Sequence, residues 1–181
     1  MDMKPQITTN RLELSQWQKQ DLEPFAKLNS DPKVMQFFPS TLNREQSDQL
    51  VDKIKAHFDK YGYGLWSTSL KETGEFIGFI GLLQVGFEAH FTPAIEIGWR
   101  LDHKFWGKGY ATEGASVVID YAFNTLKISE IVSFTSQLNL PSIRLMKRLG
   151  MTHDNKDDFD HPRLDSTHRL CRHCLFRKRS Y

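Results

Sequence analysis

The sequence predicts a mixed α+β fold in which helices flank a mostly antiparallel sheet. Residues 65–101 contain three apolar runs separated by turns, the pattern of an antiparallel meander. Residues 110–126 then place apolar side chains at three- and four-residue spacing, which indicates a helix with a wide apolar face. A further apolar run at 131–135 follows that helix, so we expect it to lie parallel to the strand before the helix.

Length and charge narrow the class of protein. The chain has 181 residues, with 24 Lys and Arg against 22 Asp and Glu. We expect a single domain over residues 1–181. A net charge of +2 is too small to indicate nucleic acid or a membrane surface as a partner. Residues 1–5 lack the apolar core of a signal peptide, and no run approaches the ~18 apolar residues of a membrane span. We therefore expect a soluble, cytoplasmic protein.

The N-terminal third predicts one strand and two helices. Residues 11–17 alternate in polarity, as a half-buried strand does. Asp21 is expected to begin a helix that runs to about Asn29. Asn43 is expected to cap a second helix, which the glycine-containing segment 61–64 ends. The helices are followed by strands at 65–70 and 75–83, joined by a turn at 71–74.

Residues 95–101 form the strand on which the functional argument depends, because its two faces differ. One face carries Ile95, Ile97, Trp99 and Leu101; the other carries Glu96 and Arg100. After the long helix and the strand 131–135, Asn139 is a plausible N-cap of a further helix and Gly150 a stop. A short strand near 151–153, a polar loop and a strand at 170–176 complete the chain.

A glycine-rich segment, Trp106-Gly107-Lys108-Gly109-Tyr110-Ala111-Thr112, leads into the long helix. The first N–H groups of a helix lack internal partners and carry partial positive charge, and glycines let a ligand approach them. The segment therefore indicates a phosphate or pyrophosphate site, with a simple turn as the alternative. It lacks the P-loop spacing. It also fails the dinucleotide fingerprint, although Glu130 lies near the position of the ribose-binding acid.

The same segment resembles the signature of the GCN5-related N-acetyltransferases (the GNAT superfamily), Q/R-x-x-G-x-G/A. Trp106 departs from the first position, but W-G-K-G-Y-A-T-E is similar to the branch that acetylates ribosomal-protein N-termini (RimJ/RimL-like). Asn139 and Ser142 match a second family pattern, and residues 158–162 also resemble that branch. The resemblance implies a GNAT fold, with a central sheet of about seven strands splayed beside an acetyl-CoA cleft and about four flanking helices.

The resemblance also implies roles for particular residues. Acetyl-CoA would be held by the main chain of the strand and the loop and by the helix at 139: Trp99, Arg100, Leu101, Trp106, Gly107, Lys108, Gly109, Tyr110, Ala111, Thr112, Asn139 and Ser142. Glu96 is the candidate base for the attacking amine, with a surface or paired carboxylate as an equal alternative. Where some relatives have a tyrosine acid, this chain has Met146, so Ser142 or water must serve.

The predicted activity is therefore transfer of an acetyl group to a primary amine, either a protein N-terminus or a small amine. The alternative is a non-catalytic acetyl-CoA-binding or interaction module, which the missing tyrosine keeps open. Relatives are often dimers, so a homodimer is a further implication of the resemblance. The helices at 21–29 and 44–61 would border the acceptor pocket. Phe37, Phe38 and Trp66 are candidates for its lining, although core packing is the commoner role of such aromatics.

Three further patterns have plainer explanations, and we expect no metal. Cys171 and Cys174 form CxxC near histidines, but residues three apart in a strand point to opposite faces, so free thiols are expected. The basic residues 177–179 are expected to be a solvated chain end. The acidic residues at 154–160 could attract a cationic amine, but a solvated loop is commoner.

Overall fold

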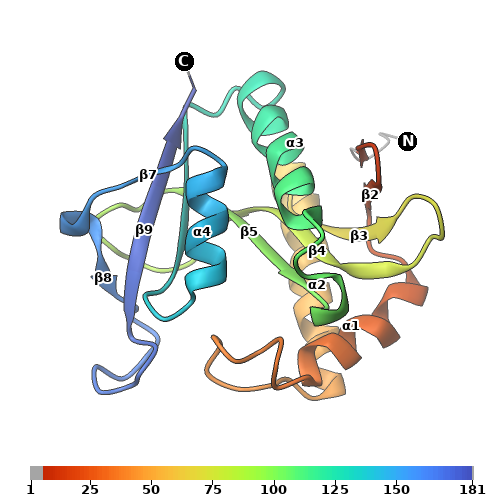
Figure 1. Ribbon diagram of the computed structural model, residues 1–181, viewed down its shortest axis with the longest axis horizontal. Coiled ribbons are helices and arrows are strands. Elements are labelled where there is room, and N and C mark those ends of the chain that lie inside the picture. The colour runs from red at the N-terminus through yellow and green to blue at the C-terminus, as the bar shows by residue number, and fades with distance from the viewer. Residues whose placement is uncertain (1–5, 181) are drawn as a thin grey trace.

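The computed structural model describes residues 6–180; the N-terminal segment considered above for a signal peptide lies outside them. One nine-stranded sheet organises the fold (Figure 1). Its strands are β1 (Ile7–Thr8), β2 (Leu12–Ser15), β3 (Leu65–Leu70), β4 (Phe76–Gln84), β5 (Ile95–Leu101), β6 (Glu130–Ser136), β7 (Thr152–His153), β8 (Phe159–Asp160) and β9 (Arg172–Arg179). The helices are α1 (Leu22–Ser30), α2 (Arg44–Tyr61), α3 (Tyr110–Asn124) and α4 (Leu140–Arg148), with 3₁₀ turns at Lys19–Asp21, His103–Phe105 and Asn155–Asp157.

The sheet order confirms a mostly antiparallel fold. The strands follow the order β1-β2-β3-β4-β5-β6-β9-β7, and β8 pairs with β9. Among the strands of residues 6–180, only β5 and β6 are a parallel pair, as expected for strands joined through a crossover helix, here α3. The predicted number of strands was lower because β1 and β8 have two residues each, too few to show alternation.

The two halves of the sheet are splayed. β4 and β5 pair along their whole length, from Gly78–Leu101 to Gln84–Ile95. β5 and β6 instead share one register pair, Glu96 with Val132, and then diverge. In Figure 1 the half that contains β6 and β9 stands nearly upright beside the half that contains β3, β4 and β5. After Glu96, the edge of β5 that faces β6 therefore has no strand partner.

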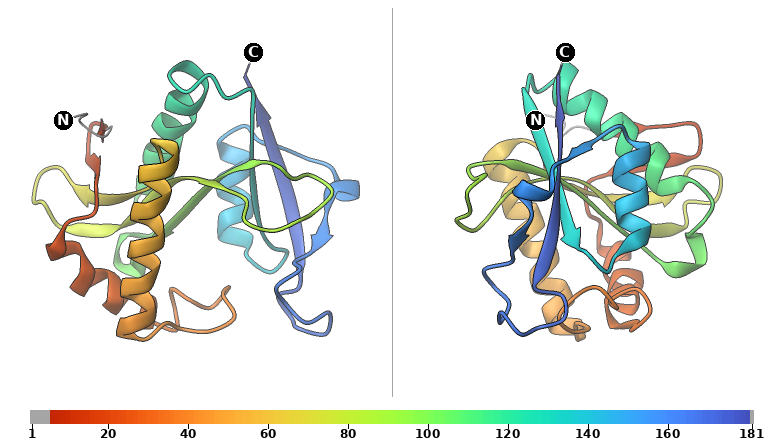
Figure 2. Two further views of the ribbon diagram at one scale, coloured as in Figure 1. Left: turned by 180° about the vertical axis from the view of Figure 1, so that it is seen from behind. Right: turned by 60° about the vertical axis from the view of Figure 1, so that its left-hand side comes forward.

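Helices cover both faces of the sheet, as two neighbouring residues of β4 show. The side chain of Ile80 lies under α3, and a Cβ atom on Gly114 would collide with it. The side chain of Phe79 points to the opposite face, where its ring centroid is 6.0 Å from that of Phe25 in α1. Figures 1 and 2 show α3 and α4 on one side of the sheet and α2 on the other. The place where β5 and β6 diverge therefore has different helices on its two faces.

The predicted ends of α2 and the predicted start of α4 are confirmed. Asn43 and Gln46 form a reciprocal capping box at the start of α2, and Gly62 ends that helix with φ = 76°. The Asn139 side chain accepts a hydrogen bond from Ser142 N at the start of α4. No helix within residues 6–180 combines the length and apolar character needed to cross a membrane.

The C-terminal strand corrects one prediction. β9 begins at Arg172 and continues to Arg179, beyond the predicted strand at 170–176. Its basic residues are not simply a solvated chain end: Arg177 pairs with Glu130 at 2.9 Å and with Asp157 at 2.7 Å, and Arg179 pairs with Glu130 at 2.7 Å. These ion pairs connect β9 to β6 and to the 3₁₀ turn before β8. The charged end of the chain is therefore part of the sheet.

Candidate active site

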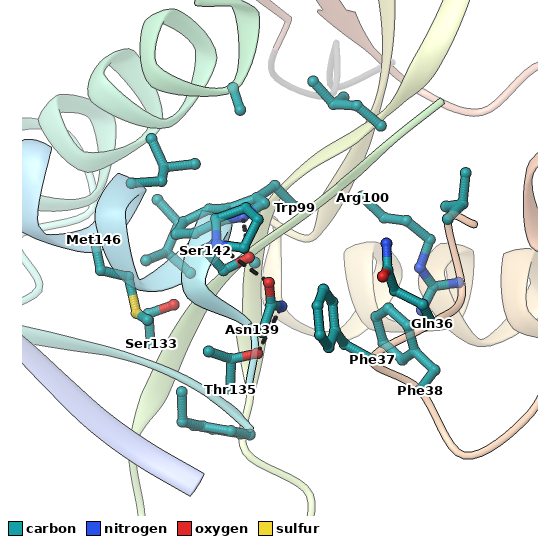
Figure 3. Close-up of a pocket in the computed structure, with 18 of the residues that line it drawn as sticks. Gln36, Phe37, Phe38, Trp99, Arg100, Ser133, Thr135, Asn139, Ser142 and Met146 are labelled. Atoms are coloured by element: carbon teal, nitrogen blue, oxygen red, sulfur yellow. Dashed lines mark hydrogen bonds between the residues drawn. The ribbon is translucent and has the colours of Figure 1, made fainter. Parts of the chain in front are cut away.

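A cavity of about 660 Å³ lies where β5 and β6 diverge. Every residue predicted to bind acetyl-CoA or to act in catalysis lines it, apart from Lys108. Strand β5 supplies one wall, strand β6 and helix α4 supply another, and the glycine-rich turn before α3 closes one end. Figure 3 shows side chains from these separate parts of the chain converging on one space.

The turn before α3 has the backbone geometry expected of an anion site. Gly107 and Gly109 have φ values of 74° and 82°, which L-residues with side chains rarely adopt. A Cβ atom on Gly107 would have open space around it within 4 Å. Gly109 is the N-cap of α3 and has no side chain to occupy the first N–H groups of the helix, those of Tyr110 to Thr112. These amides are available to a pyrophosphate.

Arg11 holds this turn and was not among the predicted site residues. Its Nη1 donates to Lys108 O at 3.0 Å, and its Nε donates to Glu113 Oε2 at 2.6 Å. Its guanidinium also lies 4.5 Å from the centre of the Tyr110 ring. Glu113 additionally accepts hydrogen bonds from Arg11 N and the Thr9 hydroxyl. The segment between β1 and β2 thus fixes both the turn and the first turn of α3.

We expect Arg11→Gln to weaken acetyl-CoA binding by about tenfold, because the main-chain amides of the turn would lose their fixed orientation. Calorimetric titration with CoA measures the change. Arg44→Gln is a matched control, since Arg44 forms ion pairs with Glu23 and Asp48 away from the cavity. An unchanged dissociation constant for the Arg11 variant, with the control also unchanged, would remove Arg11 from coenzyme binding.

The free edge of β5 faces the cavity. Its N–H and C=O groups beyond Glu96 that point toward β6 have no strand partner there and can bind an amide-containing chain. Trp106 Nε1 donates to Leu101 O at 2.9 Å, which occupies that carbonyl. The Trp99 indole points to the face that α3 and α4 cover, and its Nε1 donates to Ser142 Oγ at 3.3 Å. Asn139 also donates to Thr135 Oγ1, which ties α4 to β6 (Figure 3).

Glu96 is at the junction of the two half-sheets. Its side chain lines the cavity, on the face of β5 opposite Trp99. Among the described residues no hydrogen-bond donor or cation pairs with its carboxyl group, so it is not part of an ion pair. Burial raises the pKa of Glu96 to about 8. A carboxyl group with such a pKa can exchange a proton near neutral pH.

The second face of the cavity carries different chemistry. The segment between α1 and α2 contributes Phe37 and Phe38, and the segment before β9 contributes His161. The prediction of core packing is therefore wrong for Phe37 and Phe38, which line the cavity, and correct for Trp66, which is fully buried. Burial lowers the pKa of His161 to about 4, with contributions from His173 and Arg163, so its imidazole is neutral. Residues 158–162 carry a family resemblance that includes His161, but the sequence does not predict that His161 lines the cavity.

The remaining cysteine and acidic residues lie outside this cavity. Cys171 and Cys174 are free, as predicted, and both are buried. Ligand atoms of His153, Asp158 and Cys174 lie within 4.8 Å of one another, but Asp158 Oδ1 already accepts from His153 Nε2 at 2.7 Å and from Leu175 N. The acidic loop is bound to basic neighbours, and none of its carboxylates lines the cavity. It therefore does not form the acceptor site.

Comparison with known families identifies the class of protein that this fold and cavity define. Residues 11–152 match the family model described as an acetyltransferase (GNAT) domain. The chain belongs to this family, and it is an acyltransferase. GNAT acetyltransferases use acetyl-CoA, which is consistent with the open main-chain amides before α3.

The similarity to known proteins extends over most of the chain. An uncharacterised protein of Bacillus subtilis, YkkB, is 30% identical over 83% of this chain and 87% of its own. The FsC-acetyl coenzyme A-N(2)-transacetylase of Aspergillus fumigatus is 32% identical over 83% of this chain and 66% of its own. The structure of an acetyltransferase from Agrobacterium tumefaciens is 26% identical, with a TM-score of 0.77 over 97% of this chain and 95% of that one.

Proposed function

We propose that this protein is an N-acetyltransferase in which a primary amine attacks acetyl-CoA directly within a ternary complex. One observation carries the proposal. A single cavity connects the open amides before α3, on one face of the splayed sheet, to the unpaired carboxyl group of Glu96 on the other. Two substrates entering from opposite faces would meet between β5 and β6, and holding them together supplies much of the rate enhancement.

We assign the coenzyme to the face covered by α3 and α4. The amides of the Gly107–Thr112 turn would bind its pyrophosphate, and the free edge of β5, from Trp99 to the N–H of Leu101, would bind the amide groups of its pantetheine arm. Asn139 and Ser142 lie on the same side of the cavity. When bound, acetyl-CoA supplies an acetyl group activated as a thioester. The remaining groups must therefore manage the protons of the amine.

We assign the base to Glu96. A protonated amine cannot attack, so its proton must leave before or during N–C bond formation, and Glu96 is the carboxyl group that lines the cavity. As the new bond forms, the C–S bond breaks and the thiolate of CoA leaves. The Ser142 hydroxyl accepts from Trp99 Nε1 and keeps its own proton to donate, whereas Met146 is fully buried and has none to offer. Ser142 is accordingly our candidate proton donor.

Several finer features also belong to this proposal. The resemblance of W-G-K-G-Y-A-T-E supports a ribosomal-protein (RimJ/RimL-like) branch, and the RimL structure in complex with coenzyme A shares the fold at a TM-score of 0.75 and 16% identity. That resemblance lies in the coenzyme-binding half, so it does not choose the acceptor. One catalytic domain over the whole chain, a cytoplasmic location, a metal-free reaction and a homodimer remain predictions from the sequence.

An amine panel with acetyl-CoA, read by the release of free thiol, tests the proposed function. We expect amine-dependent thiol release and a product heavier by one acetyl group, with the panel including small amines and peptides with free N-termini. The alternative of a non-catalytic coenzyme-binding module predicts calorimetric binding of CoA without amine-dependent release for any amine. Failure of CoA to bind at all would contradict both.

A further inference from the structure

Arg100 lines the cavity on the face where the acceptor would enter, yet no acidic side chain among residues 6–180 pairs with it. It projects from β5 on the same side as Glu96 and lies between two aromatic rings, with its guanidinium carbon 4.1 Å from the centre of Phe38 and 5.3 Å from that of Phe79. Figure 3 shows it beside Gln36 and Phe38, across the cavity from Asn139. A cation in this position costs free energy unless an anion compensates it.

Nη1 of the Arg100 guanidinium is held by the protein, whereas Nη2 has no partner among residues 6–180. Nη1 donates to Asn29 Oδ1 at 2.6 Å, and Asn29 in turn donates to Ser47 Oγ at 2.9 Å. Nε is buried without an acceptor, and no acceptor among residues 6–180 reaches Nη2. Nε is enclosed, so a carboxylate would reach the guanidinium through Nη2–H, in a charge-assisted hydrogen bond that is roughly twice as strong as one between neutral groups. Arg100 is therefore oriented for an anion that the protein does not supply.

The rest of the cavity is also poor in negative charge. Within the described part of the chain, its lining contains three arginines, Arg100, Arg148 and Arg163, and one acidic residue, Glu96. His161 and His173 add no negative charge and favour neither sign strongly when neutral. A polycationic acceptor would meet like charge here, whereas an acceptor with an acidic group would meet Arg100.

We propose that the acceptor is a small primary amine that also carries a carboxylate, which Arg100 binds while Glu96 receives the proton of the amine. This inference rests on the proposed function. Residues 96 and 100 lie on one strand face about 13 Å apart at ~3.3 Å per residue, so the amine and the carboxylate must be separated by several bonds. The segments on either side of this chamber are tied together by a hydrogen bond from Arg169 to Gln36 O at 2.7 Å, which favours a small acceptor.

A matched series of ω-amino acids and their amides tests the inference. Glycine, 4-aminobutanoate and 6-aminohexanoate are each compared with the corresponding amide, with kcat/KM measured from thiol release. We expect the longer acids to exceed their amides by about 10- to 100-fold, the range for a charge-assisted pair. Equal values for acid and amide throughout would overturn the proposal, while acetylation of both would leave the acetyltransferase activity standing. Preference for a peptide over every amino acid would likewise overturn it.

Two variants separate the charge of Arg100 from its packing. Arg100→Gln removes the cation and should reduce the acid-to-amide ratio to near one. Asn29→Asp changes no atom that lines the cavity but gives Arg100 an internal carboxylate, and it should reduce the same ratio even if Arg100→Gln fails to fold. CoA affinity measured by calorimetry should be unchanged in the Asn29 variant. A ratio that stays at the wild-type value in a folded Asn29→Asp protein would contradict the assignment.

Discussion

Gly109→Asp is expected to abolish measurable coenzyme binding. Gly109 has φ = 82°, and its N-cap position places any side chain next to the open amides of α3. An aspartate there would put negative charge where we propose that the pyrophosphate binds, and one such charge pair at ~4 Å costs about 4 kcal/mol near a protein surface. Arg11 Nη2, 3.4 Å from the new Cβ position, would be drawn to the introduced carboxylate. Calorimetric titration with CoA should show affinity weakened by at least about 100-fold.

The control for Gly109→Asp is a variant with similar backbone strain at a glycine outside the cavity. Gly74, in the turn between β3 and β4, has φ = 71° and open space around a Cβ atom, so Gly74→Asp imposes a similar strain far from the cavity. Both variants should lose a similar amount of thermal stability, and only Gly109→Asp should lose CoA binding. Wild-type affinity in a folded Gly109→Asp protein would show that the turn does not bind the pyrophosphate.

Local patterns predicted the parts of the fold that depend on neighbouring residues. The alternation along 95–101 correctly separated Trp99 from Glu96, because strand geometry fixes which face each side chain takes. The caps at Asn43 and Asn139 could be predicted because each side chain accepts a hydrogen bond from the main-chain N–H three residues later. The turn before α3 could be predicted because its backbone needs positive φ at two positions, and glycine adopts positive φ readily.

Contacts between distant segments could not be predicted in the same way. Arg11 bonds Lys108, 97 residues away, and nothing near Arg11 in the sequence indicates that partner. The basic end of β9 was misassigned because its strand pairing is stabilised by Glu130 and Asp157 rather than by apolar alternation. Phe37 and Phe38 look like core residues by composition, and only the path of the segment between α1 and α2 places them on the cavity.

Glu96→Gln is expected to lower kcat by about 10²- to 10⁴-fold, the usual contribution of a general base. The amide has nearly the shape of the acid, so CoA affinity should change little. Because burial raises the pKa of Glu96 to about 8, wild-type kcat should rise with pH and level off above that value. In the variant, kcat should no longer rise with the ionisation of residue 96 and should rise only as the amine itself loses its proton. Wild-type rates across pH in the variant would remove Glu96 from the mechanism.

Stability provides a second readout that does not depend on turnover. A carboxyl group whose pKa is higher in the folded state than in the unfolded chain binds its proton more tightly when folded. Its contribution to stability is therefore fully present below the unfolded value of about 4.3 and is lost as the pH rises toward about 8. Glutamine at position 96 does not ionise, so the melting temperature of Glu96→Gln should gain on that of the wild type across this window. If the melting temperatures of the two proteins instead differed by a constant amount from pH 5 to pH 8, the pKa of Glu96 would not be raised in the folded state. Burial would then not suit Glu96 to act as a base near neutral pH.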